Sequence, residues 1–108
     1  MSDYDYIPKL YDVEFEAPET TRQSDEFFHA TIDGERKRFN IHDYATLYGI
    51  PWLYDIALYH NLACRTPTEM SAAIDKVWTD LGVDRGGLRV LELGAGSGAF
   101  GHELRHTL

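Results

Sequence analysis

The chain of 108 residues is poor in basic side chains, in cysteine and in long apolar stretches. Its 10 Lys and Arg residues stand against 18 Asp and Glu residues, which gives a formal net charge of −8 at pH 7. Nucleic acids and anionic membranes attract positively charged surfaces, so the composition argues against both as partners. The one basic cluster, Arg36-Lys37-Arg38, lies beside a turn and is expected to be the solvated end of a strand.

Cys64 is the only cysteine, which excludes an internal disulfide bond and a zinc site built from several cysteines. This scarcity fits a reducing compartment, and we expect a cytoplasmic protein. No stretch approaches the roughly 18 apolar residues that span a bilayer. The first ten residues carry neither an apolar run nor a basic lead, so no signal peptide is expected. The length suffices for one small domain with a modest core and leaves the oligomeric state open.

The first half of the chain has the period of β-strands. Residues 13–16 alternate between apolar and acidic side chains and predict a strand that ends before Pro18. Residues 27–41 predict a hairpin around Asp33-Gly34, because this dipeptide supplies the positive φ angles of a tight two-residue turn. The apolar face that the two hairpin strands are expected to share contains Phe28, Ala30, Ile32, Phe39 and Ile41.

Three helices are predicted after the hairpin. Residues 42–49 form a short helix that Gly49 ends, and Pro51 begins a second helix over residues 51–62. The third helix begins at the capping box of residues 66–69 and ends at Gly82. The apolar stripes of the last two helices comprise Leu53, Ile56, Ala57 and Tyr59 or His60 in one, and Met70, Ile74, Val77, Trp78 and Leu81 in the other.

Residues 88–93, LRVLEL, have the mostly apolar pattern of a strand that is covered on both faces. Gly94, Gly96 and Gly98 follow, and residues 99–108 read as the opening of a helix. Glycines let the backbone turn sharply and let a ligand approach without a Cβ in the way. The helix behind them offers unpaired N–H groups. This arrangement predicts a bound nucleotide cofactor.

Glu92 separates two classes of cofactor. Residues 94–99 satisfy the G-x-G-x-x-G/A fingerprint of enzymes that bind NAD or FAD. Strands of that class usually stay apolar up to the first glycine, whereas Glu92 places a carboxylate two residues before Gly94. A buried carboxylate is costly without a partner, and a cofactor with an ammonium or sulfonium group would supply one.

The stretch VLELGAGSG, residues 90–98, resembles the first motif of class I S-adenosylmethionine-dependent methyltransferases. That motif consists of two hydrophobic residues followed by E/D-x-G-x-G-x-G, and its acid and glycines line the methionine end of the cofactor. The tyrosine-rich stretch of residues 42–70 loosely resembles the helical segment that precedes this domain and partly covers the cofactor. The cofactor-binding residues that the resemblance implies are Glu92, Gly94, Ala95, Gly96, Ser97 and Gly98.

The resemblance implies an α/β fold of two parts. Residues 1–86 would form an N-terminal hairpin and a helical, lid-like region, and residues 87–108 would begin an incomplete Rossmann-like domain that binds S-adenosylmethionine. The ribose-binding acid, the catalytic residues and further βα units of that family follow the glycine loop. We therefore expect a truncated, N-terminal part of a methyltransferase that is inactive by itself, with an unidentified methyl acceptor.

Residues 102–106, HELRH, match the H-E-x-x-H pattern of zinc peptidases. His102 and His106 would share one helical face and could hold a metal ion, with Glu103 as the base. No third ligand follows them, and Arg105 places a charge where zinc peptidases, by resemblance, keep uncharged residues. We therefore expect no metal site, with Phe100 and Leu104 facing the core and the histidines facing water.

Five other residues are weaker candidates. Cys64 is expected to be a small buried apolar residue. His42 and Asp43 could form an acid–base pair, although a helix cap explains Asp43 better. Tyr44 and Tyr48 share one helical face and could either close over a cofactor or pack in the core. The alternative to an enzyme is a non-enzymatic α+β module whose hairpin and helices bind a protein partner.

Overall fold

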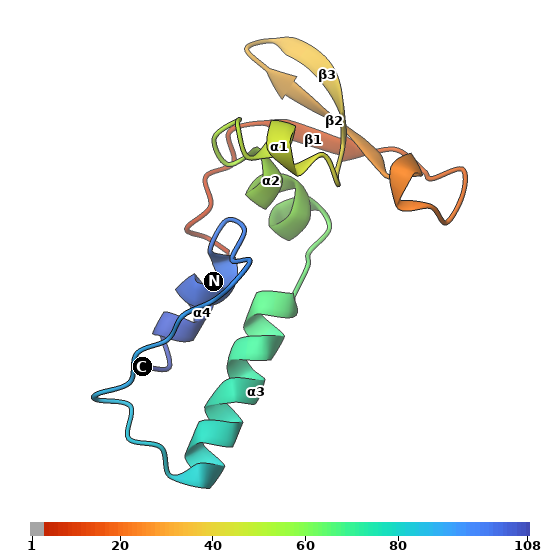
Figure 1. Cartoon of the computed structure of the whole chain (residues 1–108). Helices are drawn as coiled ribbons and strands as arrows, with labels where there is room; N and C mark the ends of the chain where they lie inside the picture. The colour runs from red at the N-terminus through yellow and green to blue at the C-terminus, as the bar shows by residue number, and fades with distance from the viewer. Residues whose placement is uncertain (1–3) are drawn as a thin grey trace. The chain divides into compact units, whose positions relative to one another are not determined.

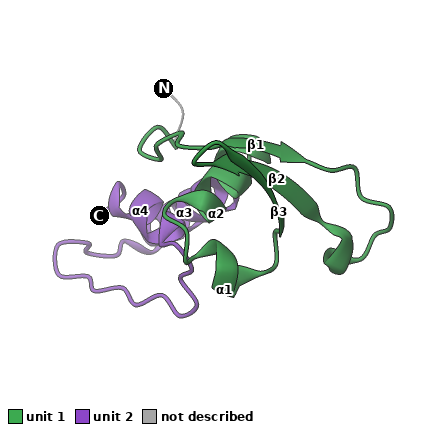
Figure 2. Ribbon diagram, turned by 90° about the horizontal axis from the view of Figure 1, so that it is seen from above, with its two compact units in different colours: residues 1–63 green, residues 64–108 purple. Residues whose placement is uncertain are grey.

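The computed structural model describes residues 4–108 and has a mixed α/β fold with two compact units. The first unit extends to Ala63, and the second runs from Cys64 to Leu108 (Figures 1 and 2). The predicted domain boundary between residues 86 and 87 lies inside the second unit and stays a prediction. Among the described residues, no helix combines the length and the apolar character that crossing a membrane requires.

The first unit contains a three-stranded antiparallel sheet in the order β1-β2-β3 (Figure 1). The strands are β1 (Asp12–Phe15), β2 (Phe27–Ile32) and β3 (Glu35–Asn40), and the short 3-10 helix η1 (Gln23–Asp25) lies between the first two. Asp33 and Gly34 join β2 to β3 with φ angles of 52° and 78°. The predicted strand and the predicted hairpin are therefore confirmed, and the turn has the positive φ angles expected of its type.

The core of the first unit lies against one face of this sheet. Phe28 and Ala30 are fully buried on β2, and Ile41 is buried just after β3. The rings of Phe15 and Phe39 flank the ring of Phe28, with centroids 5.2 and 5.5 Å from it. The apolar face predicted from the hairpin pattern is thus the face that forms the core.

Two short helices complete this core. They are α1 (Tyr44–Leu47) and α2 (Leu53–Asp55), and a single π-helical turn, η2 (Ile56–Asn61), continues from α2. The predicted start of the second helix at Pro51 is wrong. The N–H of Leu53 closes a turn onto the carbonyl of Ile50, and Trp52 adopts φ 65° before the helix begins. The predicted stripe is confirmed, because Leu53, Ile56, Ala57 and Tyr59 are all buried.

The second unit is built around α3 (Thr66–Leu81), whose limits agree with the prediction. Its predicted capping box does not form, because Arg65 occupies the cap position and the Arg65 guanidinium instead pairs with Glu69 at 3.3 Å. The predicted end is confirmed. Gly82 has φ 65° there, and the N–H of Val83 donates to the carbonyl of Trp78, which satisfies an otherwise unpaired group at the end of the helix.

Arg85 links α3 to the end of the chain within the second unit. Its Nη1 donates to Asp75 Oδ1 at 2.6 Å and to the carbonyl of Thr107 at 2.7 Å. Its Nη2 donates to the carbonyl of Asp75 and to the hydroxyl of Thr79, each at 3.0 Å. The guanidinium therefore joins α3 to the residues after α4 (Ala99–Arg105), the last helix.

The predicted strand over residues 88–93 is wrong. Among residues 4–108 the only sheet is β1-β2-β3, and residues 88–93 pair with no strand. A strand needs a neighbour to receive its N–H and C=O groups, so an apolar pattern alone does not create one. Leu91 and Leu93 consequently stay 85% and 87% exposed, where the pattern predicted two covered faces. The mixed α/β class is correct at this coarser level.

Candidate functional site

The glycine loop has a backbone that side-chain-bearing residues rarely adopt. Gly94, Gly96 and Gly98 have φ angles of 67°, 58° and 83°. A Cβ at Gly94 or Gly98 would meet no atom within 4 Å, so backbone conformation rather than crowding favours glycine there. Ala95 and Ser97, between the glycines, are exposed. The loop is therefore open to a ligand and leads directly into α4.

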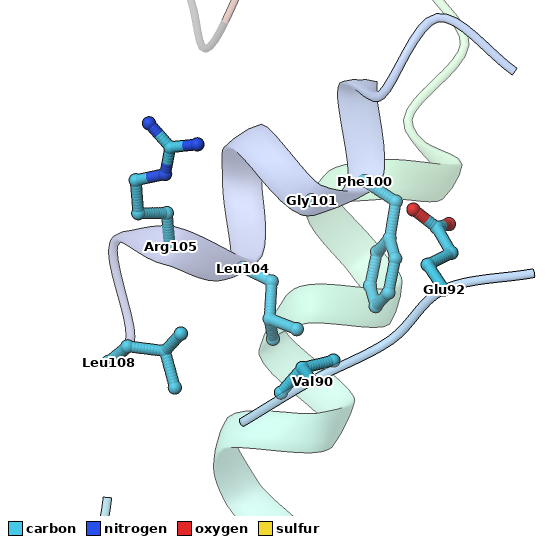
Figure 3. Close-up of a pocket in the computed structure, with 7 residues that line it drawn as sticks. All are labelled: Val90, Glu92, Phe100, Gly101, Leu104, Arg105 and Leu108. Carbon is cyan, nitrogen blue, oxygen red and sulfur yellow. The ribbon is translucent and has the colours of Figure 1, made fainter. Parts of the chain in front are cut away.

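Glu92 lies beside α4, two residues before the loop. Figure 3 shows its side chain at the Phe100 end of a shallow cavity between residues 90–92 and α4. The Glu92 Oε1 atom lies 3.9 Å from the position that a Cβ of Gly101 would take. Among the residues that the structure describes, the Glu92 carboxylate has neither a hydrogen-bond nor an ion-pair partner. This half-buried acid is therefore available to a cationic group.

The cavity itself is mostly apolar and has a volume of about 180 Å³. Its charged groups are the carboxylate of Glu92 and the guanidinium of Arg105, which lie at different ends of α4 in Figure 3. The residues that line it are Val90, Glu92, Phe100, Gly101, Leu104, Arg105 and Leu108. The carboxylate of Glu92 could accept a hydrogen bond from a ligand that carries positive charge.

The HELRH segment brings its two histidines together, His102 on α4 and His106 directly after it. The rings of His102 and His106 have centroids 5.4 Å apart, while Leu104 between them is 3% exposed. Phe100 is half-buried, so the apolar residues take the inner face as predicted. Within residues 4–108, no group of three or more His, Cys, Asp or Glu side chains is arranged to hold a metal ion.

The weaker candidates depart from their predictions. Core packing of the tyrosine pair is wrong, because Tyr44 and Tyr48 are each 47% exposed. His42 does not pair with Asp43: its Nδ1 lies 3.2 Å from the Tyr44 hydroxyl and its Nε2 lies 3.4 Å from a carboxylate oxygen of Glu26. Asp43 precedes α1 without a side-chain capping bond, because its φ and ψ angles of −82° and 70° are not those of an extended cap residue.

Cys64 is half-buried rather than buried, and its thiol donates to the Thr66 hydroxyl at 3.5 Å. Arg65 and Thr66, which follow Cys64 at the start of α3, are both exposed to solvent. The thiol thus behaves as a partly exposed polar group at the start of α3.

Charge pairing across the sheet explains the basic cluster. Arg38 donates to both carboxylate oxygens of Glu16, at 2.7 and 3.0 Å, and Arg36 lies 3.3 Å from Glu14. Lys37 lies 3.9 Å from Glu35. The hydrogen bond from Arg38 lowers the pKa of the Glu16 carboxyl below its ordinary value. Arg36 and Arg38 of β3 thus pair with Glu14 of β1 and with Glu16 just after it, across β2, whereas Lys37 lies near an acid of its own strand.

Two contributors to these sites were missed by sequence reasoning. Tyr54 and Glu26 approach the predicted candidates from elements that lie apart from them in the sequence. The spacing of Tyr54 from Tyr48 spans the turn before α2, so no single helical period relates them.

Comparison of the chain with models of protein families, with curated proteins and with solved structures finds no match.

Proposed function

We propose that this chain carries the first cofactor-binding segment of a class I S-adenosylmethionine-dependent methyltransferase. The observation that carries the proposal is the position of Glu92, two residues before three glycines that all have left-handed φ angles. In this proposal residues 87–108 begin a Rossmann-like domain. The methyl acceptor and the catalytic residues are not identified.

Three features support this assignment over a plain turn. A plain turn needs at most two left-handed residues, whereas this loop has three at alternate positions. The loop is exposed, so its conformation is not imposed by surrounding side chains. The carboxylate of Glu92 lacks a partner among the described residues, and a half-buried acid without a partner is costly unless a ligand supplies one.

The chemistry of the proposed reaction is direct displacement. When bound, S-adenosylmethionine supplies a methyl group activated by its sulfonium sulfur. The protein contributes alignment and proximity, which can lower a barrier substantially without a catalytic acid or base. Glu92 would orient the methionine end through a charge-assisted hydrogen bond, and the glycines at positions 94, 96 and 98 would let the backbone approach the cofactor closely.

The test is a titration of the ¹⁵N-labelled chain with S-adenosylmethionine and, separately, with NAD⁺, up to millimolar concentrations. We expect S-adenosylmethionine to shift the amide signals of residues 92–98, with weak affinity, and NAD⁺ to leave them unchanged. Shifts caused by NAD⁺ alone would move the assignment to a nicotinamide enzyme. If neither ligand shifts the loop, the proposal fails and the non-enzymatic interaction module becomes the better reading.

A further inference from the structure

Three tyrosine rings form a cluster on the first unit, far in sequence from the glycine loop. The tyrosine cluster comprises Tyr44 and Tyr48 from α1 and its end, and Tyr54 from α2. The ring centroids of Tyr44 and Tyr48 lie 6.0 Å apart with nearly parallel planes, and those of Tyr48 and Tyr54 lie 4.9 Å apart. Tyr44 and Tyr54 close the triangle at 6.1 Å. Tyr44 and Tyr48 present aromatic surface to solvent, while Tyr54 is half-buried and packs against the core of the first unit.

The chain around this cluster is acidic and lacks fixed cations. No Lys or Arg occurs between Arg38 and Arg65, whereas Asp43 and Asp55 lie next to tyrosines of the cluster in the sequence. Asp55 is only 9% exposed. Burial raises the pKa of Tyr48, a hydrogen bond with Tyr54 opposes this shift, and the charges of Tyr44 and Asp55 raise the pKa further. The carboxylate of Asp55 therefore contributes negative potential at Tyr48.

Neighbouring groups hold the cluster in place. His42 contacts the Tyr44 hydroxyl through Nδ1 at 3.2 Å and crosses the Tyr44 ring edge-on, while Glu26 approaches the other nitrogen of His42.

We propose that the tyrosine cluster binds an organic cation of the methylated-ammonium class. A cation is attracted to an aromatic ring when it lies within about 6 Å of the ring centroid. Because the three centroids lie within 6.1 Å of one another, a cation over the exposed ring of Tyr44 or Tyr48 also lies near the other two rings. A methylated ammonium fits better than a lysine-type ammonium, which is compact and strongly hydrated. The proposal is independent of the methyltransferase assignment.

The test compares choline with 3,3-dimethyl-1-butanol, which has the same shape but no charge. Each is titrated into the full chain at constant ionic strength, and the signals of the tyrosine rings and of residues 44–54 are followed by NMR. We expect saturable shifts with choline at millimolar concentrations and an affinity at least about five-fold lower for the neutral alcohol. Equal affinities would overturn the proposal without any variant, because they would show that charge contributes nothing.

Variants then locate the site. Tyr48→Phe keeps the ring and should retain choline binding, whereas Tyr48→Leu removes the ring and should weaken it about five-fold or more. Trp78→Leu is the matched control, since this ring lies in the second unit against the guanidinium of Arg85. Tyr44→Leu repeats the test if Tyr48→Leu does not fold. Unchanged choline affinity in a folded Leu variant, or an equal loss in Trp78→Leu, would contradict the assignment.

Discussion

The glycine loop can be tested by two alanine substitutions three residues apart. Gly98 has φ 83°, and an L-residue with a Cβ pays roughly 1–2 kcal/mol in that region. Gly101 lies inside α4, where alanine is favoured over glycine by up to about 1 kcal/mol. The methyl group of Gly101→Ala would lie 3.9 Å from Glu92 Oε1, an ordinary contact that adds no strain. The two variants should therefore differ by about 1–3 kcal/mol.

Urea denaturation measures this difference. Trp78 reports the second unit, so the variants are made in a Trp52→Phe background and followed by fluorescence. With a slope of about 1–3 kcal/mol per molar urea, the midpoint of Gly98→Ala should lie on the order of 1 M below that of Gly101→Ala. Both substitutions add the same methyl group, so each controls for the other. A Gly98→Ala protein as stable as Gly101→Ala would refute the left-handed geometry of the loop.

Three further predictions follow from other parts of the molecule. Arg85→Ala should destabilise the second unit by about 2–4 kcal/mol in the same urea assay, because it removes several hydrogen bonds, one of them to the partly exposed Asp75. The control Arg89→Ala, at an exposed position, should change the stability by less than about 0.5 kcal/mol. Similar losses in the two variants would contradict the role of Arg85 in joining α3 to the residues after α4. The pKa of Glu16 is lowered from 4.5 in the folded state, so the ionised carboxylate stabilises the fold above pH 4.5. This stabilisation is lost as the pH falls through the lowered pKa. Thermal unfolding should therefore show a smaller loss of stability from pH 6 to pH 3 in Glu16→Gln than in the wild type, and parallel profiles would count against the Arg38 pairing. Metal analysis of untagged protein should give far less than one equivalent of zinc, and stoichiometric zinc that disappears in His102→Ala would restore the peptidase interpretation.

Local sequence signals predicted the elements whose causes are local. The hairpin formed because Asp33-Gly34 supplies its turn, and α3 ended where Gly82 adopts a left-handed conformation. The start of α2 was wrong because Pro51 lies in a turn, where its carbonyl accepts a hydrogen bond from the hydroxyl of Tyr11, forty residues earlier. A contact between residues so far apart in the sequence cannot be predicted from the spacing of apolar residues within one helix.

The strand prediction failed for a similar reason. The apolar pattern of residues 88–93 reports a tendency to be covered, but hydrogen bonding to another strand depends on a neighbour that the pattern does not specify. The glycine loop was predictable because its positive φ angles are properties of single residues. The tyrosine cluster was only half predictable, since the spacing that relates Tyr44 to Tyr48 says nothing about Tyr54 across the turn.

The measurement that tests the central claim most directly is the effect of Glu92→Gln on both cofactor affinity and stability. The change keeps the shape of the side chain and removes its charge. If the carboxylate holds the methionine end of S-adenosylmethionine, binding should weaken by on the order of 1.5–3 kcal/mol, so the weak shifts that the wild-type chain shows at millimolar cofactor should disappear. The urea midpoint should stay the same or rise slightly, because the described structure gives Glu92 no internal partner to lose. Glu103→Gln on the same helix should leave affinity unchanged. A lower midpoint with unchanged affinity for S-adenosylmethionine would instead identify Glu92 as a structural acid and contradict the methyltransferase assignment.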